Sequence, residues 1–214
     1  MTIETLEVSG LEPALHAMRN PMDSWDKSDS QWEDIGNIIK MYKFFNVGEK
    51  DKDLSERLQA AGTEHCKHLR MVMVYADIKA PRYWWNEFDT YRAGVEKVSC
   101  STMHKLMARP LCEDDFEHDC MNNEYLGYVI ESINTSMEAW RFEHDQDVKK
   151  EIWRSIIQAL PQSYLQKRTV MMSYAALRNI VRQREGHKLS EWKQFIDWCH
   201  KLPEDWMIFG GSND

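Results

Sequence analysis

The sequence predicts an α+β fold, a helix-rich single domain over residues 1–214 with a small antiparallel or mixed sheet. Three observations lead to this prediction. Apolar residues recur at helical spacing along most of the chain, apolar runs of strand length are few, and the sequence holds no internal repeat and no Gly-, Pro- or Ser-rich linker. With 214 residues, 43% of them hydrophobic, and nine Trp, the chain can bury a core as one large domain or as a compact subunit of an oligomer.

The first third of the chain is predicted to contain one strand and two helices. Residues 3–8 form a plausible short strand. A first helix is expected where apolar side chains recur at helical spacing, at Trp32, Ile35, Ile39, Tyr42 and Phe45. A second helix is expected through Leu54, Leu58 and Ala61, with Asp53 as a possible N-cap.

A second strand and another helix are predicted on either side of Pro81. Residues 72–76 are a short, apolar and partly β-branched run, which is typical of a strand. Pro81 ends this strand and can open a helix at its first turn. This helix is predicted to continue along one apolar stripe, formed by Trp84, Phe88, Tyr91, Val95 and Val98.

The C-terminal half is predicted to be helical. Three stripes comprise Tyr125, Val129, Ile133, Met137 and Trp140, then Val148, Ile152, Ile156 and Leu160, and finally Leu189, Trp192, Phe195, Cys199 and Leu202. A further helix, opened by Pro161, is expected over residues 164–185, and Arg184 continues its apolar stripe. Lys167 lies at the other end of this helix, roughly 25 Å from Arg184 at 1.5 Å per residue. One small ligand could not touch both within one subunit, so they serve different sites or an oligomer brings them together.

Arg184 has two interpretations at this level. A buried arginine needs an anion, which is either a carboxylate in a core salt bridge or part of a bound ligand. The helical pattern alone leaves both open.

Composition excludes some classes of protein. A net charge of −8 and a pI near 5.5 argue against a nucleic-acid polymer as the main partner, whereas a small anionic nucleotide needs only a few local cations. The N-terminus lacks the basic and apolar regions of a signal peptide, and no apolar run has the length of a membrane span. Five cysteines without a disulfide-scaffold spacing fit a reducing compartment, so a cytoplasmic protein is expected.

Two acidic segments interrupt the helical pattern, residues 23–34 and 112–120. We interpret both as solvated loops, with an active-site cover as the alternative for the first. Cys112, His118 and Cys120 match no usual zinc spacing, so no metal site is expected there. The cluster of two His and one Cys at residues 65–68 is interpreted as a helix end.

The C-terminal part of the chain, from residue 160 to 191, resembles the flavin-dependent thymidylate synthases. Leu160-Pro161 matches the opening of the family pattern, and His187 and Glu191 resemble its end once one residue is deleted. The resemblance implies that Lys167 and Arg184 bind the nucleotide substrate. It also implies that Ser173 and Asn179 lie on the flavin side, where the family has two Asn.

Residues 65–92 resemble the same family, and Lys79-Ala80-Pro81 ends the corresponding strand. Its Arg-His-Arg motif, which holds flavin and substrate, falls on Thr90-Tyr91-Arg92, so only the last Arg is kept. The resemblance implies that the cofactor-binding residues also include His65, Lys67, Arg70, Thr90, Tyr91 and Arg92. It implies that Glu87, Arg92 and Ser101 contact the substrate. Lys67, Arg70 and Arg82 are the nearest cations that could replace the charge of the missing Arg-His pair.

The resemblance implies a thymidylate synthase-like enzyme in which cofactors rather than side chains carry the chemistry, so no catalytic residue is predicted. In this family reduced FAD and methylenetetrahydrofolate methylate dUMP, with NADPH as a further co-substrate, in a homotetramer whose active sites are shared among subunits. Two alternatives stay open. One is a nucleotide-binding homologue that has lost or changed the flavin chemistry, which Thr90-Tyr91 indicates. The other is a helical interaction protein without a small-molecule site.

Overall fold

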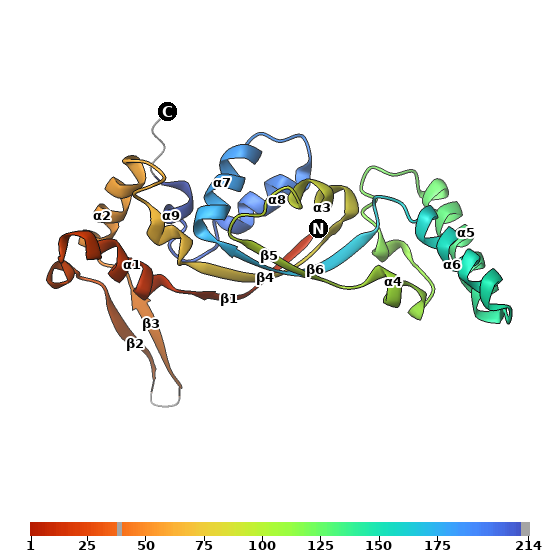
Figure 1. The fold of residues 1–214 in the computed structure, drawn as a ribbon, viewed down its shortest axis with the longest axis horizontal. Helices are drawn as coiled ribbons and strands as arrows, with labels where there is room; N and C mark the ends of the chain where they lie inside the picture. The colour runs from red at the N-terminus through yellow and green to blue at the C-terminus, as the bar shows by residue number, and fades with distance from the viewer. Residues whose placement is uncertain (38–39, 211–214) are drawn as a thin grey trace. The chain divides into compact units, whose positions relative to one another are not determined.

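The structure, a computed structural model, describes residues 1–37 and 40–210, and for residues 35–37 and 40–42 it describes the backbone (Figure 1). The helices and strands follow one another in this order: β1 (Thr2–Ser9), α1 (Leu11–Arg19), η1 (Asn20–Met22), η2 (Trp25–Lys27), β2 (Gln31–Asn37), β3 (Lys40–Asn46), α2 (Glu49–Ala60), η3 (Lys67–Arg70), β4 (Met73–Pro81), α3 (Arg82–Phe88), β5 (Val95–Ser99), α4 (Thr102–Lys105), η4 (Leu106–Ala108), η5 (Glu113–Asp115), α5 (Asn123–Phe142), α6 (Gln146–Ala159), β6 (Leu165–Ser173), α7 (Tyr174–Arg184), α8 (Ser190–Cys199) and α9 (Trp206–Phe209), where η marks a 3₁₀ turn. The predicted helix-rich α+β fold with a small sheet is confirmed.

The strands form two sheets, and the chain divides into two compact units. One sheet has four strands in the order β1-β4-β6-β5, and the other is the antiparallel hairpin of β2 and β3. The first unit comprises residues 1–4, 77–90 and 97–169, and the second comprises residues 5–76, 91–96 and 170 onward. Strands β1, β4, β5 and β6 each contribute residues to both units. A single domain over residues 1–214 stays a prediction.

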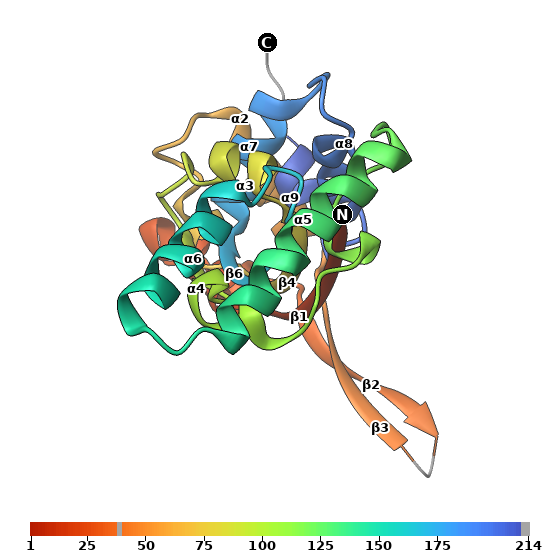
Figure 2. The same ribbon diagram turned by 90° about the vertical axis from the view of Figure 1, so that its right-hand side faces the viewer.

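The core of the first unit lies along the helix pair α5 and α6, which run side by side (Figure 2). Both helices begin at side-chain caps. Asn122 accepts a hydrogen bond from the backbone N–H of Tyr125 at 3.1 Å, and Asp145 accepts from Asp147 at 2.9 Å. The buried apolar side chains of this core are Leu106, Leu111, Phe116, Leu126, Ile133, Met137, Ile156 and Leu160. The predictions of these two helices are therefore confirmed.

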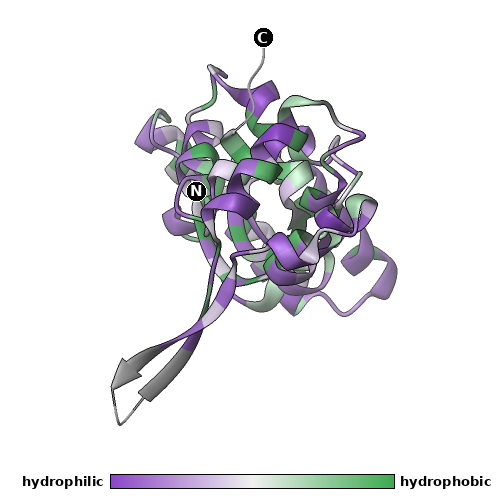
Figure 3. Cartoon of the chain, turned by 90° about the vertical axis from the view of Figure 1, so that its left-hand side faces the viewer, coloured by the Kyte–Doolittle hydropathy of each residue, from purple (hydrophilic) through white to green (hydrophobic). Residues whose placement is uncertain are grey.

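In the second unit, α1 and α7 pack against the turn η3, and α7 also packs against α8 and α9. Tyr174, Trp192 and Phe195 are fully buried there and fill the space around α7 and α8. The stripe predicted for residues 189–202 thus faces the core, as α8. The hairpin of β2 and β3 extends away from the helices of this unit (Figure 3).

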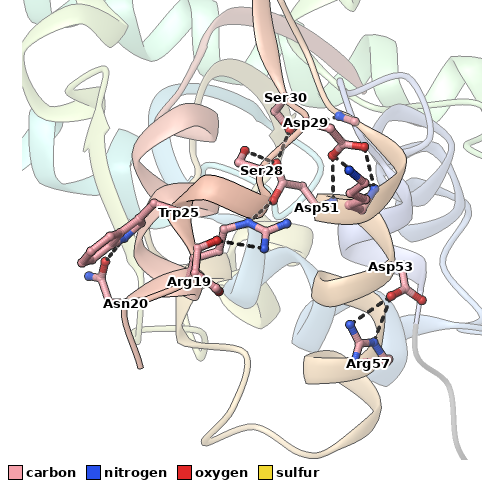
Figure 4. A network of polar contacts seen from close by, with 12 residues as sticks. Arg19, Asn20, Trp25, Ser28, Asp29, Ser30, Asp51, Asp53 and Arg57 are labelled. Atoms are coloured by element: carbon pink, nitrogen blue, oxygen red, sulfur yellow. Dashed lines mark hydrogen bonds and ion pairs between the residues drawn. The ribbon is translucent and has the colours of Figure 1, made fainter. Parts of the chain in front are cut away.

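The acidic segment at residues 23–34 is fastened to α2 by polar contacts (Figure 4). The carboxylate of Asp51 is fully buried and accepts hydrogen bonds from Arg19 at 2.5 Å and from Ser28 and Ser30 at 2.6 Å. Burial alone would raise the pKa of Asp51, but these hydrogen bonds and the charge of Arg19 outweigh it and lower the pKa. Asp29 accepts hydrogen bonds from the first backbone N–H groups of α2. The segment is largely exposed, as predicted, but it is anchored at these positions. The loop interpretation is wrong for residues 31–34, which belong to strand β2.

The second acidic segment, residues 112–120, is a loop with one buried carboxylate. Asp115 is 7% exposed and binds both terminal guanidinium nitrogens of Arg109, at 2.7 and 2.5 Å. The interpretation as a wholly solvated loop is therefore wrong at Asp115, because a bidentate arginine offsets the cost of burying the charge.

The helix predicted through Trp32 and Phe45 is wrong, because these residues face each other across the hairpin, with ring centroids 5.2 Å apart. Gly36 and Asn37 lie inside the predicted helix and are poor helix formers that favour turns. The predicted position Ile39 lies outside the described residues. The cap predicted for the following helix is also wrong. Helix α2 begins after Gly48, and Asp53 lies inside it and pairs with Arg57.

The helix predicted from Pro81 through Val98 is right only as far as Phe88, the last residue of α3. Gly94 then adopts a positive φ of 71°, which ends any helical path, and residues 95–99 form β5. The strand predicted at residues 72–76 is confirmed within β4, and Pro81 ends it and precedes α3 as expected. The strand predicted at residues 3–8 is confirmed as β1.

The single helix predicted over residues 164–185 is wrong, because its first half is strand β6. Burial alternates along residues 167–172, as expected for a strand. The side chain of Ser173 caps α7 by accepting from the N–H of Ala176 at 3.1 Å. Lys167 therefore lies on a strand and Arg184 on a helix. The separation of roughly 25 Å along one helix does not exist, and it gives no support to an oligomer.

Among the helices in residues 1–37 and 40–210, none combines the length and the apolar character that a membrane span requires.

Candidate functional site

The second unit contains a pocket of about 540 Å³, here called the arginine pocket. Its polar side chains come from Thr63, Arg70, Ser173, Arg178, Asn179 and Arg182, and Gly94 also lines it. Leu69, Met73 and Ala176 add apolar walls. A volume of this size and a mostly apolar lining with a few convergent polar groups are typical of small-molecule sites.

Three segments supply most of the residues of the arginine pocket. The turn η3 supplies Leu69 and Arg70, and the loop before β5 supplies Gly94. Helix α7 supplies the remaining cations, Arg178 near its middle and Arg182 in its last turn. Ser173 donates its backbone N–H to the carbonyl of Gly94 at 2.9 Å. A Cβ at position 94 would lie 2.5 Å from the hydroxyl of Ser173, so both the positive φ and the close approach require glycine here.

The N-terminus of α7 lies at the pocket. Ser173 and Ala176, which flank the first turn of this 11-residue helix, both line it. The first N–H groups of a helix carry a partial positive charge and bind anions. The helix therefore adds to the positive potential that the arginines create.

Arg178 is the buried cation of the pocket, with 7% of its surface exposed. One of its terminal nitrogens donates hydrogen bonds to the side-chain oxygen of Gln59 and to the carbonyl of Gly210. Burial, and then the charge of Arg182, lower the pKa of Arg178. The surroundings thus disfavour the cation, and an anion bound in the pocket would offset that penalty.

Arg184 lies further along α7, in an aromatic environment. Its Nε donates to the hydroxyl of Tyr91 at 2.8 Å, and its guanidinium carbon lies 4.5 Å from the ring centroid of Trp192. His187 packs edge-on against the same indole, with ring centroids 6.2 Å apart. The half-buried guanidinium is stabilised by a hydrogen bond and by cation–π contacts. The helical spacing of the sequence did not indicate these aromatic contacts.

The predicted cofactor residues divide into those that line the arginine pocket, those next to a lining residue in the sequence, and those with other contacts. Arg70, Ser173 and Asn179 line the arginine pocket, and His65 and Lys67 are exposed on either side of Cys66, which also lines it. Arg92 is exposed and directly precedes Ala93, another lining residue. Tyr91 is buried and holds Arg184, whereas Thr90 in the first unit donates its hydroxyl to the carbonyl of Glu87 at 2.7 Å.

Three predicted substrate residues lie in the first unit and do not line the pocket. Lys167 is exposed on β6 and its Nζ lies 2.5 Å from a carboxylate oxygen of Asp77. Ser101 caps α4 by accepting from the N–H of His104 at 3.3 Å, and Glu87 is half-buried on α3. The contacts of Lys167 and Ser101 are therefore with neighbouring protein groups and not with the arginine pocket.

Sequence reasoning missed Arg178, Arg182 and Gly94. The two arginines are four residues apart, a spacing that places side chains on one face of a helix, and Asn179 lies between them. That spacing was a usable signal. For Gly94 the signal was an isolated glycine inside a predicted helix.

No cluster of three or more His, Cys, Asp or Glu in residues 1–37 and 40–210 has the arrangement of a metal site. Cys112, Cys120 and the other cysteines of this part of the chain are unpaired thiols.

Comparisons with models of protein families and with curated protein sequences gave no match. The chain is similar to two crystal structures of the flavin-dependent thymidylate synthase ThyX from Helicobacter pylori, both described as complexes with FAD and dUMP and one determined at 2.31 Å resolution. In each comparison the TM-score is 0.69, the identity is 18%, and the match covers 97% of this chain and 96% of the other. The similarity establishes a ThyX-like fold for almost the whole chain.

Proposed function

We propose that this chain is a flavin-dependent thymidylate synthase-like enzyme, which binds FAD in the arginine pocket and transfers a one-carbon unit to C5 of a pyrimidine nucleotide such as dUMP. The observation that carries the proposal is the convergence of Arg70, Arg178 and Arg182 with the N-terminus of α7 on one pocket. The ThyX structures that share the fold are complexes with FAD and dUMP, which supports the same ligand classes here.

The residues of the pocket fit an anionic cofactor such as FAD. The pyrophosphate of FAD needs several donors and positive charge, which guanidinium groups and helix N–H groups supply. Leu69, Met73 and Ala176 offer apolar contacts that exclude water from the rings. When bound, FAD supplies hydride-transfer chemistry, and the side chains bind and orient the reactants. NADPH and methylenetetrahydrofolate are the co-substrates of this proposal.

The nucleotide would be bound by the remaining predicted cations. Arg184 and Arg92 are proposed to contact its phosphate, with Glu87 and Ser101 as further substrate contacts. Lys167 belongs to the proposed set as well, and it would have to exchange its ion pair with Asp77 for the phosphate. An exposed ion pair of this kind contributes little stability, so the exchange has a small cost.

Tyr91 favours a second candidate, a nucleotide-binding homologue without flavin chemistry. This residue stands where the resemblance leads us to expect a histidine, and its buried phenol carries no charge and accepts a hydrogen bond from Arg184. In that case the pocket would take an anionic nucleotide and the protein would produce no methylated product.

FAD binding by the purified protein tests the proposal. We expect a flavin absorbance band, or saturable quenching of FAD fluorescence on titration. Arg182→Met should weaken FAD binding about 10-fold to 100-fold, because it removes a charged donor from the pocket. Arg154→Met changes an exposed arginine on α6 and is the matched control, with an unchanged dissociation constant expected.

An assay with FAD, NADPH, methylenetetrahydrofolate and dUMP separates the two candidates. Formation of the methylated nucleotide supports the enzyme, and binding of dUMP without product and without flavin supports the second candidate. A protein that binds neither FAD nor dUMP at millimolar concentration contradicts both.

A further inference from the structure

A chain of buried polar side chains leads from the arginine pocket into the interior of the second unit. Gln59 and Ser55 lie on α2 and His68 lies on η3, with exposed fractions of 4%, 0% and 3%. The hydroxyl of Ser55 is 2.7 Å from Nε2 of His68, and Nε2 of Gln59 is 3.2 Å from the same hydroxyl. The side-chain oxygen of Gln59 in turn accepts from Arg178, which lines the pocket.

The chemistry of these groups fixes the direction of the two hydrogen bonds that Gln59 makes with side chains. A guanidinium only donates, so the oxygen of Gln59 must face Arg178 and its amide nitrogen must donate to Ser55. The hydroxyl of Ser55 and Nε2 of His68 share the next hydrogen bond, and the tautomer of the ring decides which of the two donates. Nδ1 of His68 is buried and has no hydrogen-bond partner among the described residues. The chain therefore terminates inside the protein at His68 and points outward at Arg178.

We infer that Gln59 is a positioning residue for the proposed anion site: supported by Ser55 and His68, it orients the guanidinium of Arg178 toward a bound pyrophosphate or phosphate group. The inference rests on the proposed function, because it assigns an anionic ligand to the arginine pocket. Gln59 can do this without charge. A carboxylate at the same place would hold the guanidinium equally well but would cancel the charge that attracts the ligand.

The backbone carbonyl of Gly210 completes this arrangement. It accepts from the same terminal nitrogen of Arg178 as Gln59 does, and the amide oxygen of Gln59 would lie 3.7 Å from a Cβ at position 210. Two neutral acceptors thus fix one nitrogen of the guanidinium from the side of the protein interior. Fixing a flexible side chain before the ligand arrives lowers the entropy that binding must overcome.

The test is a double-mutant cycle on FAD affinity with the full chain. Gln59→Met keeps the shape of the side chain and removes its polar atoms, and we expect it to raise the dissociation constant about 10-fold. In an Arg178→Met background the same change should alter the dissociation constant less than about 2-fold, because Gln59 acts through Arg178. A residue that only stabilises the fold would give the same fold-change in both backgrounds.

Two further variants serve as a control and as a replacement for Gln59→Met. Gln194→Met makes the same chemical change at an exposed position of α8 and should leave FAD affinity unchanged. Ser55→Ala replaces Gln59→Met if the latter does not fold, and it should weaken FAD binding by a smaller factor that also vanishes in the Arg178→Met background.

Inorganic pyrophosphate is the second probe. It separates failure of the inference about Gln59 from failure of the proposed function. If the parent binds FAD but Gln59→Met has no effect, or an equal effect in both backgrounds, the inference is overturned and the proposed function stands. If the parent binds pyrophosphate but not FAD, the flavoenzyme proposal is overturned, and the cycle measured with pyrophosphate decides the inference. A parent that binds neither probe overturns both.

Discussion

His68 is the residue whose protonation is most tightly tied to the fold of the second unit. Its ring is 3% exposed, Nε2 faces the hydroxyl of Ser55, and Nδ1 has no partner among the described residues. Burial lowers its pKa from 6.5 to about 4, because a charged imidazole would lose its hydration without gaining a counter-ion. The folded protein therefore holds this histidine neutral at pH values where an exposed histidine is protonated.

We expect the free energy of unfolding to fall as the pH is lowered from about 6.5 to about 4. In this window the unfolded chain binds a proton at His68 that the folded chain rejects, so the stability present above the unfolded pKa is lost as the pH falls. The full effect is on the order of 3 kcal/mol, at ~1.4 kcal/mol per pKa unit. Urea denaturation at several pH values measures it. His68→Gln should flatten this dependence, and His104→Gln, at an exposed position of α4, should not. An equally steep dependence in His68→Gln would contradict the assignment.

At the scale of elements, the best-predicted helices are those that have both an apolar stripe and a side-chain cap, such as α5 and α6. It failed where a helical spacing of apolar residues also suited a strand. Residues 165–173 and the hairpin at residues 31–46 are the two examples. In both regions the deciding information was local, since Ser173 caps the next helix and Gly36-Asn37 favours a turn. Giving these short signals more weight than the spacing would have corrected both.

The candidate site was predictable in part from the resemblance to a known family and not from apolar spacing. Arg70, Ser173 and Asn179 followed from a resemblance that fixes positions along the chain, and they do line one pocket. The contact of Gln59 with Arg178 joins residues 119 positions apart, so no spacing rule could indicate it. Tyr91 was expected beside a ligand, but only the folded chain brings its hydroxyl to Arg184.

The junction of β5, β6 and α7 yields a prediction at the same scale. Gly94→Ala should lower the free energy of unfolding by about 2 kcal/mol or more, because it adds a Cβ at positive φ that meets the hydroxyl of Ser173 at 2.5 Å. It should also weaken FAD binding, since Gly94 and Ser173 both line the pocket. The control is Gly127→Ala on α5, where a Cβ meets nothing within 4 Å and helix propensity predicts a gain of about 0.5–1 kcal/mol. Chemical denaturation of both variants measures the difference, and equal stabilities would contradict the strain at Gly94.

At the scale of the whole molecule, the decisive quantity is how many chains complete one site. The resemblance implies a homotetramer with shared sites. The separation of Lys167 and Arg184 along one helix does not support it, because Lys167 lies on β6 and Arg184 on α7. The exposed side chains of Tyr125, Tyr128 and Phe142 on α5, at 61%, 71% and 78%, are apolar surface of the kind that association buries. Light scattering should therefore give the mass of four chains of 25.4 kDa, and a strictly monomeric protein would remove the support for shared sites.

A mixing experiment tests whether the sites are shared. Arg184→Met and Lys167→Met should each abolish most methyl transfer, because each removes a proposed phosphate contact. If every site takes Lys167 from one subunit and Arg184 from another, co-expression of the two variants in equal amounts should restore about a quarter of the parent activity, since that fraction of randomly assembled sites has both cations. The control pairs Arg184→Met with the double variant, which leaves no intact Arg184 in any site. Activity of the first mixture no higher than that of the control would show that one chain supplies both cations. Parent-like activity of Lys167→Met on its own would show that Lys167 stays paired with Asp77 and binds no substrate.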